Sequence, residues 1–457
     1  MENNLRGFLA KRNNLILLLC FLGMVMGYLV TAQSSMFLAI FAIGLFLIAY
    51  LTKLITITHL FCLIPLVSIF HIPLASVGGL NITALDTLIF LFYIFVILLI
   101  FMKKDVVLPV SLKQILLCNF IFIVPGFFSA FYFAGLSKAI TGTILVGKKW
   151  AMYAIFLPAI LFISDSGWKM VQKALLATVL IVSGVTMYSF IFPSADSAGG
   201  RASSLFFNPN VFAVLMVMLF NVSLGLLVLY RRNQLVRILI YICLLICLYG
   251  VIQSGSRTAS IATVGILLFW LFQAKEISFK FKATAIGLLV TIALLGNLLL
   301  DTTSLFQRWT DVLDGRDSVT SVTFRIDAVQ VAYYMFLDSP LFGYGFTNFT
   351  DLSQYYVAKY ALLLNQKIET TDNQYMDTLL ETGIVGIGCF FFMLAVITRH
   401  LWKQWNRSIF AKVTFANLIL FLFAGPSMPS FYSPFTSAFF WYVFAVSFIE
   451  LEKSGVI

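Results

Sequence analysis

Three arginines and one aspartate stand at the borders of apolar segments in this sequence. Arg201 lies in RASSLFFNPN, Arg257 in QSGSRTAS and Arg325 in FRIDA, while Asp372 belongs to TTDNQYM. Guanidinium groups match phosphate oxygens in bidentate pairs, and helix N-termini add positive potential. A carboxylate beside such a cluster can act as a general base on a hydroxyl group. These residue types therefore indicate a site that binds a phosphorylated substrate and activates a hydroxyl.

The local sequence places two of these arginines at helix starts. Asn208 is a suitable helix N-cap, and Pro209 fits the first helical position, where no N–H is needed. This corner holds Arg201 just outside the helix that follows. In QSGSRTAS, Gly255 and the neighbouring hydroxyl residues end one helix and start another at Arg257. We therefore expect both arginines near the N-terminal ends of helices.

The elements that position these residues are membrane-spanning helices. The chain of 457 residues is 61% hydrophobic and 11% charged, whereas soluble domains average about 45–50% and about 25%. Apolar runs predict helices near 14–32, 36–51, 54–70, 85–102, 115–135, 150–164, 174–192, 209–230, 235–252, 257–273, 283–300, 383–399, 409–424 and 433–450. The sequence thus predicts an all-α polytopic membrane protein with about 12–14 transmembrane helices.

The distribution of lysine and arginine predicts the orientation of these helices. Most of the 30 basic residues fall in alternate loops, and cytoplasmic loops are the ones enriched in them. Both termini are then cytoplasmic, and the three arginines lie on the outer face with Asp372. The net charge of +11 reflects this asymmetry rather than a nucleic-acid surface. An arginine at the membrane edge is costly unless it is paired or bound, although snorkelling to lipid headgroups is the alternative for each.

A long polar segment divides the chain into three parts. Residues 1–300 form a transmembrane helix bundle, residues 301–382 an extracytoplasmic, periplasmic loop domain, and residues 383–457 the C-terminal transmembrane helices. The loop holds more than half of the 19 acidic residues of the chain. Polar excursions of this length are usually functional.

The loop contains a predicted amphipathic helix that carries Arg325. In SVTFRIDAVQVAYYMFLDSP, four apolar residues fall on one side of a helix and Asp338-Ser339-Pro340 ends it. Such a helix can lie on the membrane surface and cover a cavity. The apolar side consists of Phe324, Ala328, Val331 and Met335.

Other features of the loop have both a functional and a simpler structural interpretation. Asp311, Asp314 and Asp317 are spaced three apart and can bind a cation, but a solvated acidic cluster is the favoured interpretation. The sequence FGYGF fits a phosphate-binding loop or a tight turn. Tyr355 and Tyr356 are among the aromatic residues that can stack on sugar rings. These features do not select a function.

The order and spacing of the four arginine- and aspartate-bearing stretches resemble the O-antigen polymerase and O-antigen ligase superfamily, the Wzy/WaaL-like membrane glycosyltransferases. That pattern runs Arg-x-x-x-Phe-x-x-Pro-Asn, then Ser-Arg, then an Arg-bearing amphipathic helix with Pro-Leu-x-Gly-x-Gly, then Asp/His-Asn and Glu-x-Gly-x-x-Gly. Here the stretches are Arg201 to Asn210, with its phenylalanine one place later, Ser256-Arg257, Arg325 to Gly345, and Asp372 to Gly386. The resemblance covers about residues 195–400.

The resemblance implies an inverting, metal-independent glycosyltransferase with a GT-C-like fold and no cofactor. Its donor is an oligosaccharide linked to undecaprenyl pyrophosphate. Arg201 and Arg257 then bind the pyrophosphate, and Arg325 and Asp372 are the candidate catalytic residues. The remaining candidate substrate contacts within the motifs are Asn210, Asn373 and Tyr344.

The resemblance also implies a cellular setting. The protein would be a multi-pass protein of the bacterial inner (plasma) membrane, with its active site facing the periplasm or exterior. Its partners would be membrane lipids, a Wzz-like chain-length regulator and a Wzx-like flippase. Nucleic acid is not an expected partner.

One departure from the ligase pattern favours a polysaccharide polymerase. Ligases have a histidine before the asparagine of the last motif, where this chain has Asp372. The three histidines, His59, His71 and His400, belong to no motif. A ligase that transfers polymer to a lipid A-core or protein acceptor is the alternative. A flippase or transporter is a remoter one, because charged residues here sit at loop ends rather than at mid-membrane.

Overall fold

The structure is a computed structural model that describes residues 57–69, 73–77, 80–83, 85–89, 92–93, 96, 110–147, 163–191, 208–273, 319–360, 368, 371–431 and 433–453. The predicted helices at 14–32, 36–51 and 283–300 lie outside the described residues. Those at 85–102 and 150–164 lie largely outside them. Arg201 and the acidic group at 311–317 are also outside the described part of the chain.

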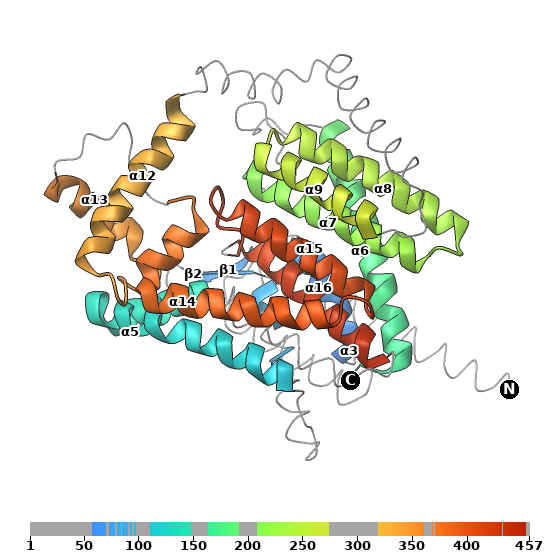
Figure 1. The fold of residues 1–457 in the computed structure, drawn as a ribbon, viewed down its shortest axis with the longest axis horizontal. Helices are drawn as coiled ribbons and strands as arrows, with labels where there is room; N and C mark the ends of the chain where they lie inside the picture. The colour runs from blue at the N-terminus through green and yellow to red at the C-terminus, as the bar shows by residue number, and fades with distance from the viewer. Residues whose placement is uncertain are drawn as a thin grey trace, which may run out of the picture.

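Apolar helices form the main bundle (Figure 1). By length and composition, six described helices suffice to cross a membrane: α5 (Val110–Gly147), α6 (Asp165–Ile191), α7 (Pro209–Leu229), α8 (Gln234–Gln253), α14 (Gln374–Lys403) and α16 (Pro434–Lys453). Shorter apolar helices accompany them: α3 (Ile57–Ile69), α9 (Arg257–Gln273) and α15 (Ile409–Ala424). The predicted all-α polytopic membrane class is confirmed, and the total number of spans stays a prediction.

Several helices extend beyond the apolar runs that predicted them. α5 continues past its predicted end near 135, where Gly135 has a non-helical backbone (φ 82°, ψ 174°) and joins two helical segments. α6 begins at Asp165 rather than near 174. α14 begins at Gln374, ahead of a kink at Gly383 (φ 66°, ψ −167°). Hydropathy marks the part of a helix suited to hydrocarbon, whereas backbone hydrogen bonding continues into polar sequence.

Helix α7 lies at the centre of the described bundle, with residues 212–223 all buried. The Asn221 Nδ2 group donates to Asn417 Oδ1 and to the Val413 carbonyl, each at 2.8 Å. Trp270 Nε1 donates to Asn221 Oδ1 at 2.8 Å. These bonds join α7, α15 and α9, and side-chain hydrogen bonds of this kind hold helices together in apolar surroundings. These bonds therefore hold α9 and α15 in place relative to each other through α7.

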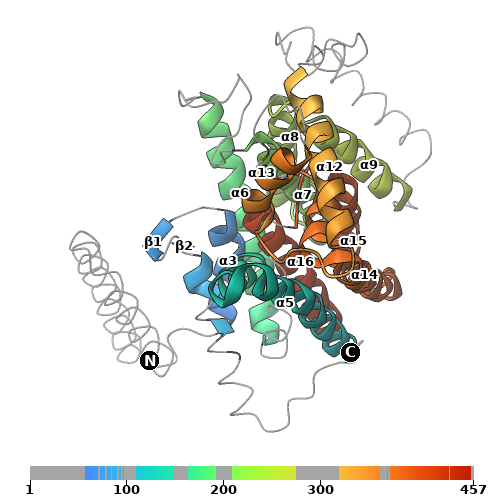
Figure 2. The same cartoon turned by 90° about the vertical axis from the view of Figure 1, so that its left-hand side faces the viewer.

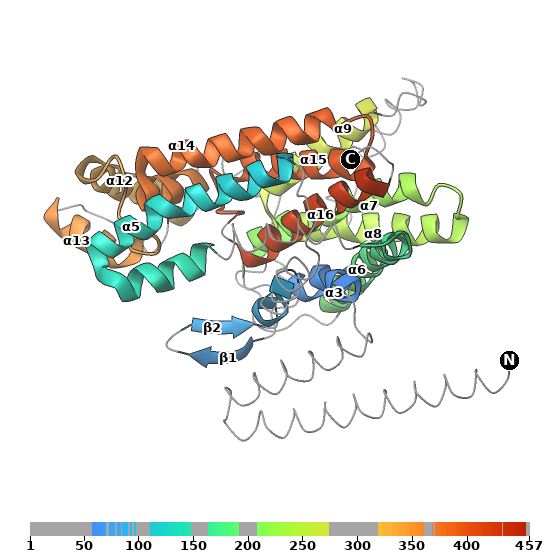
Figure 3. The same ribbon diagram turned by 90° about the horizontal axis from the view of Figure 1, so that it is seen from below.

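A small β-hairpin follows α3. Strands β1 (Pro73–Val77) and β2 (Leu80–Thr83) pair antiparallel and stand to one side of the helices (Figure 3). The sequence analysis predicted no strands here. Gly78-Gly79 is a two-residue hairpin signal in the sequence, but strands this short do not register in a search for long apolar runs. The hairpin does not change the fold class.

Helices α12 (Val319–Asp338) and α13 (Phe349–Lys359) build a second apolar core at one end of the bundle (Figures 1 and 2). Ala328, Val331 and Met335 are fully buried in this core, and Phe324 packs against it. This confirms the predicted amphipathic face, and α12 ends at Asp338 as predicted. The sequence analysis did not predict α13, whose exposed residues give it no continuous apolar run.

The segment 339–348 holds this second core against the bundle. Tyr344 N–H donates to the Leu380 carbonyl and Gly345 N–H to the Glu381 carbonyl, both at 2.8 Å. On its other side, the segment touches α5, which runs beside α14 (Figure 3). Gly345 has φ +84°, and a Cβ there would lie 2.1 Å from the Ala130 nitrogen. Glycine alone permits this approach, which fixes α12 and thereby Arg325 relative to the bundle.

Candidate functional site

A small polar cavity lies where α7, α9 and α12 meet the end of α15. Its volume is about 60 Å³, and three of the predicted site residues line it: Asn210, Arg257 and Arg325. The remaining lining residues are Val214, Gly255, Ser256, Thr258, Ala424, Ser427 and Met428. Two arginines from distant parts of the chain therefore line one space. We call this space the arginine cavity.

The turn between α8 and α9 places Arg257 at the mouth of the cavity. Ser254 caps α8 and donates from Oγ to the Val251 carbonyl at 2.6 Å. Gly255 then takes a positive φ of 62°, and Arg257 is the first residue of α9. This confirms the predicted break and helix start. As the first residue of a helix, Arg257 adds its charge to the positive potential of the helix N-terminus.

Arg325 reaches the same cavity from α12. Its Nη2 group donates to the Ser427 carbonyl in the turn after α15, at a long 3.5 Å. A bond of this length is weak. The neighbouring Ala328 and Asp327 are buried, so the helix is anchored while the arginine side chain extends toward the cavity. This geometry suits a cation that completes its bonding with an anion.

The Asn-Pro-Asn corner starts α7 as predicted. The side chain of Asn208 accepts from the backbone N–H groups of Asn210 and Val211, at 2.8 and 3.4 Å, and Pro209 is the first helical residue. The Asn210 side chain lines the arginine cavity. The role predicted for Arg201 stays a prediction, because that residue lies outside the described part of the chain.

Asp372 lies just before α14 and interacts electrostatically with Arg325. It is half-buried and has a positive φ of 50°, in the left-handed region that few residues other than glycine adopt. Burial raises the pKa of its carboxyl group above the usual range, and the charge of Arg325 opposes that rise. A carboxylate with a raised pKa beside a cation is a suitable general base.

Asn373 has a structural role in addition to the contact predicted for it. Its side chain caps α14 by accepting from Tyr375 N–H at 3.0 Å and Met376 N–H at 3.2 Å. The Thr371 hydroxyl bonds to the Asp377 carboxylate at 2.5 Å and shares bonds with the Asn373 backbone. These contacts fix the strained turn that carries Asp372. A substrate contact of the Asn373 amide group remains a prediction.

Tyr344 lies in the second apolar core rather than among the lining residues of the arginine cavity. Its hydroxyl bonds to the Tyr356 hydroxyl at 2.5 Å, and Tyr356 donates to Asp338 at 2.7 Å. Lys359 completes the group with an ion pair to Asp338 at 2.5 Å. We call these four residues the tyrosine network. Burial raises the pKa of Tyr356, and its bonds to Tyr344 and Asp338 add to that rise.

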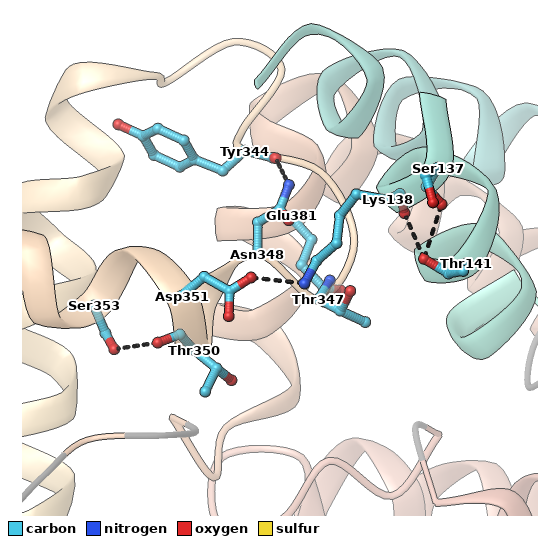
Figure 4. A network of polar contacts seen from close by, with 10 residues as sticks. All are labelled: Ser137, Lys138, Thr141, Tyr344, Thr347, Asn348, Thr350, Asp351, Ser353 and Glu381. Atoms are coloured by element: carbon cyan, nitrogen blue, oxygen red, sulfur yellow. Dashed lines mark hydrogen bonds and ion pairs between the residues drawn. The ribbon is translucent and has the colours of Figure 1, made fainter. Parts of the chain in front are cut away.

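Glu381 of the last motif has a structural role as well. Its Oε1 atom accepts from the Thr347 N–H at 3.0 Å (Figure 4). Thr347 has a positive φ of 65°, which is unusual for a β-branched residue. Nearby, Asn348 donates to the Tyr344 carbonyl at 2.7 Å, and Lys138 of α5 pairs with Asp351 of α13 at 2.6 Å. The glutamate thus holds the strained segment 339–348 against α14.

The described histidines lie away from the arginine cavity. His400 is buried near the far end of α14, stacked on Phe448 with ring centroids 4.2 Å apart. His59 is exposed on α3, and His71 lies outside the described residues. None of the residues that line the cavity is a histidine. The acidic residue that interacts with Arg325 of the cavity is Asp372, just before α14.

Ser427 and Thr258 are two polar residues of the cavity that were not predicted as site residues from the sequence. Ser427 follows α15 and supplies a carbonyl to Arg325, and its hydroxyl lies 3.0 Å from that of Thr258. The sequence GPSMPS that contains Ser427 signals a turn after an apolar run. A turn signal alone does not tell which distant helix the turn meets, so no reading of the motif order could have found this contact.

Residues 242–391 match the family model described as O-antigen ligase. The matched range contains Arg257, Arg325 and Asp372, and ends before α15. It spans less than half of the chain. Comparison of the sequence with curated proteins gives no match.

The match supports the O-antigen ligase and polymerase superfamily and, with it, a polysaccharide-processing membrane enzyme. The apolar helices agree with a multi-pass membrane protein. The match does not separate a polymerase from a ligase. Among the described residues, no group of three or more metal-ligating side chains forms a metal site.

Proposed function

We propose that this protein is a polysaccharide repeat-unit polymerase of the bacterial inner membrane. It transfers a growing glycan from undecaprenyl pyrophosphate to a sugar hydroxyl of another lipid-linked repeat unit. The glycan is an O-antigen or a related surface polysaccharide. The convergence of Arg257 and Arg325 on one cavity, with Asp372 interacting with Arg325, is the observation that carries this proposal.

The arrangement suits a single displacement with inversion at the anomeric carbon. The acceptor oxygen forms a new bond to that carbon while the bond from the carbon to the pyrophosphate oxygen breaks. The acceptor proton moves to the Asp372 carboxylate, and the departing pyrophosphate carries away the bonding electrons. Arg257 and Arg325 stabilise the negative charge that develops on the pyrophosphate. Arg201, which precedes α7 in the sequence, is the third proposed cation.

The acid at position 372 favours a polymerase over a ligase. The ligase pattern has a histidine before the motif asparagine, and this chain has Asp372 before Asn373. The raised pKa of the Asp372 carboxyl group brings it nearer to the range of a histidine. A carboxylate can therefore take the place of the imidazole as base.

The proposed orientation follows from the charge distribution of the loops. The starts of α7 and α9 and the end of α15, which meet at the arginine cavity, face the periplasm or exterior, and both termini are cytoplasmic. The growing lipid-linked glycan is assembled on that face, from repeat units that have been flipped across the membrane. A chain-length regulator and a flippase are the proposed partners.

Glycan length in a strain that lacks this protein tests the proposal. An electrophoretic ladder with single repeat units and no long chains is the result expected for a polymerase. Full-length polymer retained on its lipid carrier, with none on the final acceptor, would instead identify a ligase, the function named in the description of the matching family model. An unchanged ladder in a strain without a second such enzyme would contradict both.

Complementation with Arg257→Ala separates transfer from transport. The variant is expected to leave the ladder at single units while lipid-linked donor still reaches the outer leaflet. Donor that accumulates only on the inner leaflet would instead identify a flippase. Arg201→Lys tests bidentate phosphate binding, because lysine keeps the charge but loses the planar pair of donors. Full activity of that variant would contradict a bidentate contact.

A further inference from the structure

An apolar groove runs between α9 and α15, directly below the arginine cavity. Its volume is about 200 Å³. Every residue that lines it is apolar: Ile261, Ala262, Gly265, Ile266 and Phe269 of α9, and Ala416, Ile419, Leu420 and Phe423 of α15. No residue assigned to catalysis or phosphate binding lies in it. The groove therefore needs an explanation of its own.

The groove has a closed floor and open walls. Ala262, Ile266 and Leu420 are buried, and Leu420 is only 2% exposed. Ile419 and Phe423 on the walls are 47% and 45% exposed. Since both helices are apolar, the open side of the groove suits hydrocarbon better than water. A groove with this shape accepts a chain of hydrocarbon from the side.

The two cavities follow one another along the same pair of helices. Arg257 lies one helical turn before Ile261 on α9, and Ala424 of the arginine cavity directly follows Phe423 on α15. The hydroxyls of Thr258 and Ser427, 3.0 Å apart, join the two chain segments where the polar lining ends. The pair of cavities thus offers cationic groups at one end and hydrocarbon contact at the other.

We propose that the groove between α9 and α15 binds the isoprenoid chain of the lipid-linked substrate next to its pyrophosphate. This inference rests on the proposed function, which places the pyrophosphate at the arginine cavity. The lining from Ile261 to Phe269 extends about 12 Å at the rise of an α-helix. The groove therefore holds only the part of the chain nearest the phosphate, and the rest of the chain lies in the bilayer.

A second apolar groove, between α5 and α14, is the alternative location. It has a volume of about 330 Å³ and is lined by Cys118, Ile121, Ile384, Val385, Gly388, Cys389 and Phe392. Its upper end is covered by the segment 339–348, because Ile384 and Val385 donate backbone hydrogen bonds to the carbonyls of Pro340 and Leu341. None of its lining residues adjoins a lining residue of the arginine cavity in the chain, whereas Phe423 of the α9–α15 groove directly precedes Ala424 of that cavity. The α9–α15 groove is therefore the one that continues from the two arginines.

Glycines permit a matched set of variants. A Cβ on Gly265 of the α9–α15 groove, on Gly388 of the α5–α14 groove or on Gly184 of α6 meets no heavy atom within 4 Å. A methyl group therefore fits at all three positions, and we expect leucine, which favours the helix over glycine, to be accommodated there. Only Gly265→Leu fills the proposed binding groove.

The test is photocrosslinking of the full chain in lipid nanodiscs. The probe is a polyprenyl pyrophosphate with a diazirine in the isoprene unit nearest the phosphate, and unlabelled undecaprenyl pyrophosphate is the competitor. Labelled peptides are expected from α9 and α15. Gly265→Leu should lower the yield about tenfold, because its side chain displaces about two or three buried methylene contacts. Gly388→Leu and Gly184→Leu should leave the yield unchanged.

The outcomes separate this inference from the proposed function. Labels on α5 and α14 that respond to Gly388→Leu, or labels on α9 that ignore Gly265→Leu, would overturn the groove assignment. The glycan ladder of Arg257→Ala would still report on the function. Conversely, labelling of α9 and α15 that is sensitive to Gly265→Leu, in a protein whose loss leaves the ladder unchanged, would support the groove and overturn the polymerase.

Discussion

The arginine cavity and the tyrosine network are both polar regions attached to α12, and they differ in how their groups are bonded. In the network, Tyr344, Tyr356, Asp338 and Lys359 bond to one another over distances of 2.5 to 2.7 Å. At the cavity, Arg325 makes a 3.5 Å bond to a carbonyl and surrounds open volume with Arg257. Short mutual bonds hold a structure together, whereas cations arranged around a space are suited to an incoming anion.

This difference shows why motif membership does not by itself assign a role. Tyr344 and Arg325 belong to the same motif of the family pattern, and both were candidate site residues. The structure places Tyr344 in a core of its own and Arg325 at the cavity. We infer that Arg325, at the start of this motif, serves substrate binding. The end of the motif, with Tyr344, holds α12 in place against the bundle. Four substitutions test this division.

Arg325→Gln is expected to have the largest effect. Loss of a cation beside the developing charge should lower kcat/KM about 100-fold or more. The substitution also removes the charge that opposes the rise in the Asp372 pKa. The pKa of Asp372 then rises further. Since the ionised carboxylate is the base, the acidic limb of the pH–rate profile should shift to higher pH than in the wild type.

A pH–rate profile with isolated lipid-linked repeat unit measures both parts of this prediction. Arg399→Gln, at an exposed position far along α14, is the matched control and should keep the wild-type profile. If Arg325→Gln lowers the rate but leaves the acidic limb unshifted, Asp372 is not the base.

Gly345→Ala should destabilise the protein strongly. The new Cβ would lie 2.1 Å from the Ala130 nitrogen, at a φ of +84° that alanine avoids. Strain and overpacking together suggest a loss of about 2–3 kcal/mol. Thermal unfolding in detergent should show a lower Tm, with Gly184→Ala at an open position as control. An unchanged Tm would mean that the segment 339–348 is not held against α5.

Tyr356→Phe should weaken the tyrosine network without changing transfer. The buried hydroxyl bonds to Tyr344 and Asp338, so its loss should lower the unfolding free energy by about 1–2 kcal/mol. The rate per folded molecule should stay at the wild-type value. A large drop in that rate at full stability would transfer Tyr356 from the structural region to the functional one.

Lys138→Ala should have the smallest effect. It removes an ion pair to Asp351 in which the two side chains are 36% and 62% exposed, and exposed pairs contribute about 0–1 kcal/mol. Unfolding in low and high salt measures this contribution, which should shrink as salt screens the charges. A loss as large as that of Gly345→Ala would show that the ion pair, rather than the close backbone approach, holds α13 to α5.

Much of the fold follows from local sequence. Asn208 and Pro209 start α7, Gly255 separates α8 from α9, and Asp338 ends α12, all as predicted. Each of these features depends on residues within one or two helical turns, so a short stretch contains the whole physical cause. The starts of α6 and α14 were predicted less accurately, because both helices begin with polar turns that precede the apolar run.

The sequence alone determined the membrane-protein class, the helix caps and the residues whose types suit phosphate, because composition and residue type decide these matters locally. The tertiary structure alone decided that Arg325 meets Ser427 and that Tyr344 turns into a separate core. It also set the α9–α15 groove beneath the arginines. Such placements depend on packing between segments that are distant in the sequence, and no short stretch contains that information.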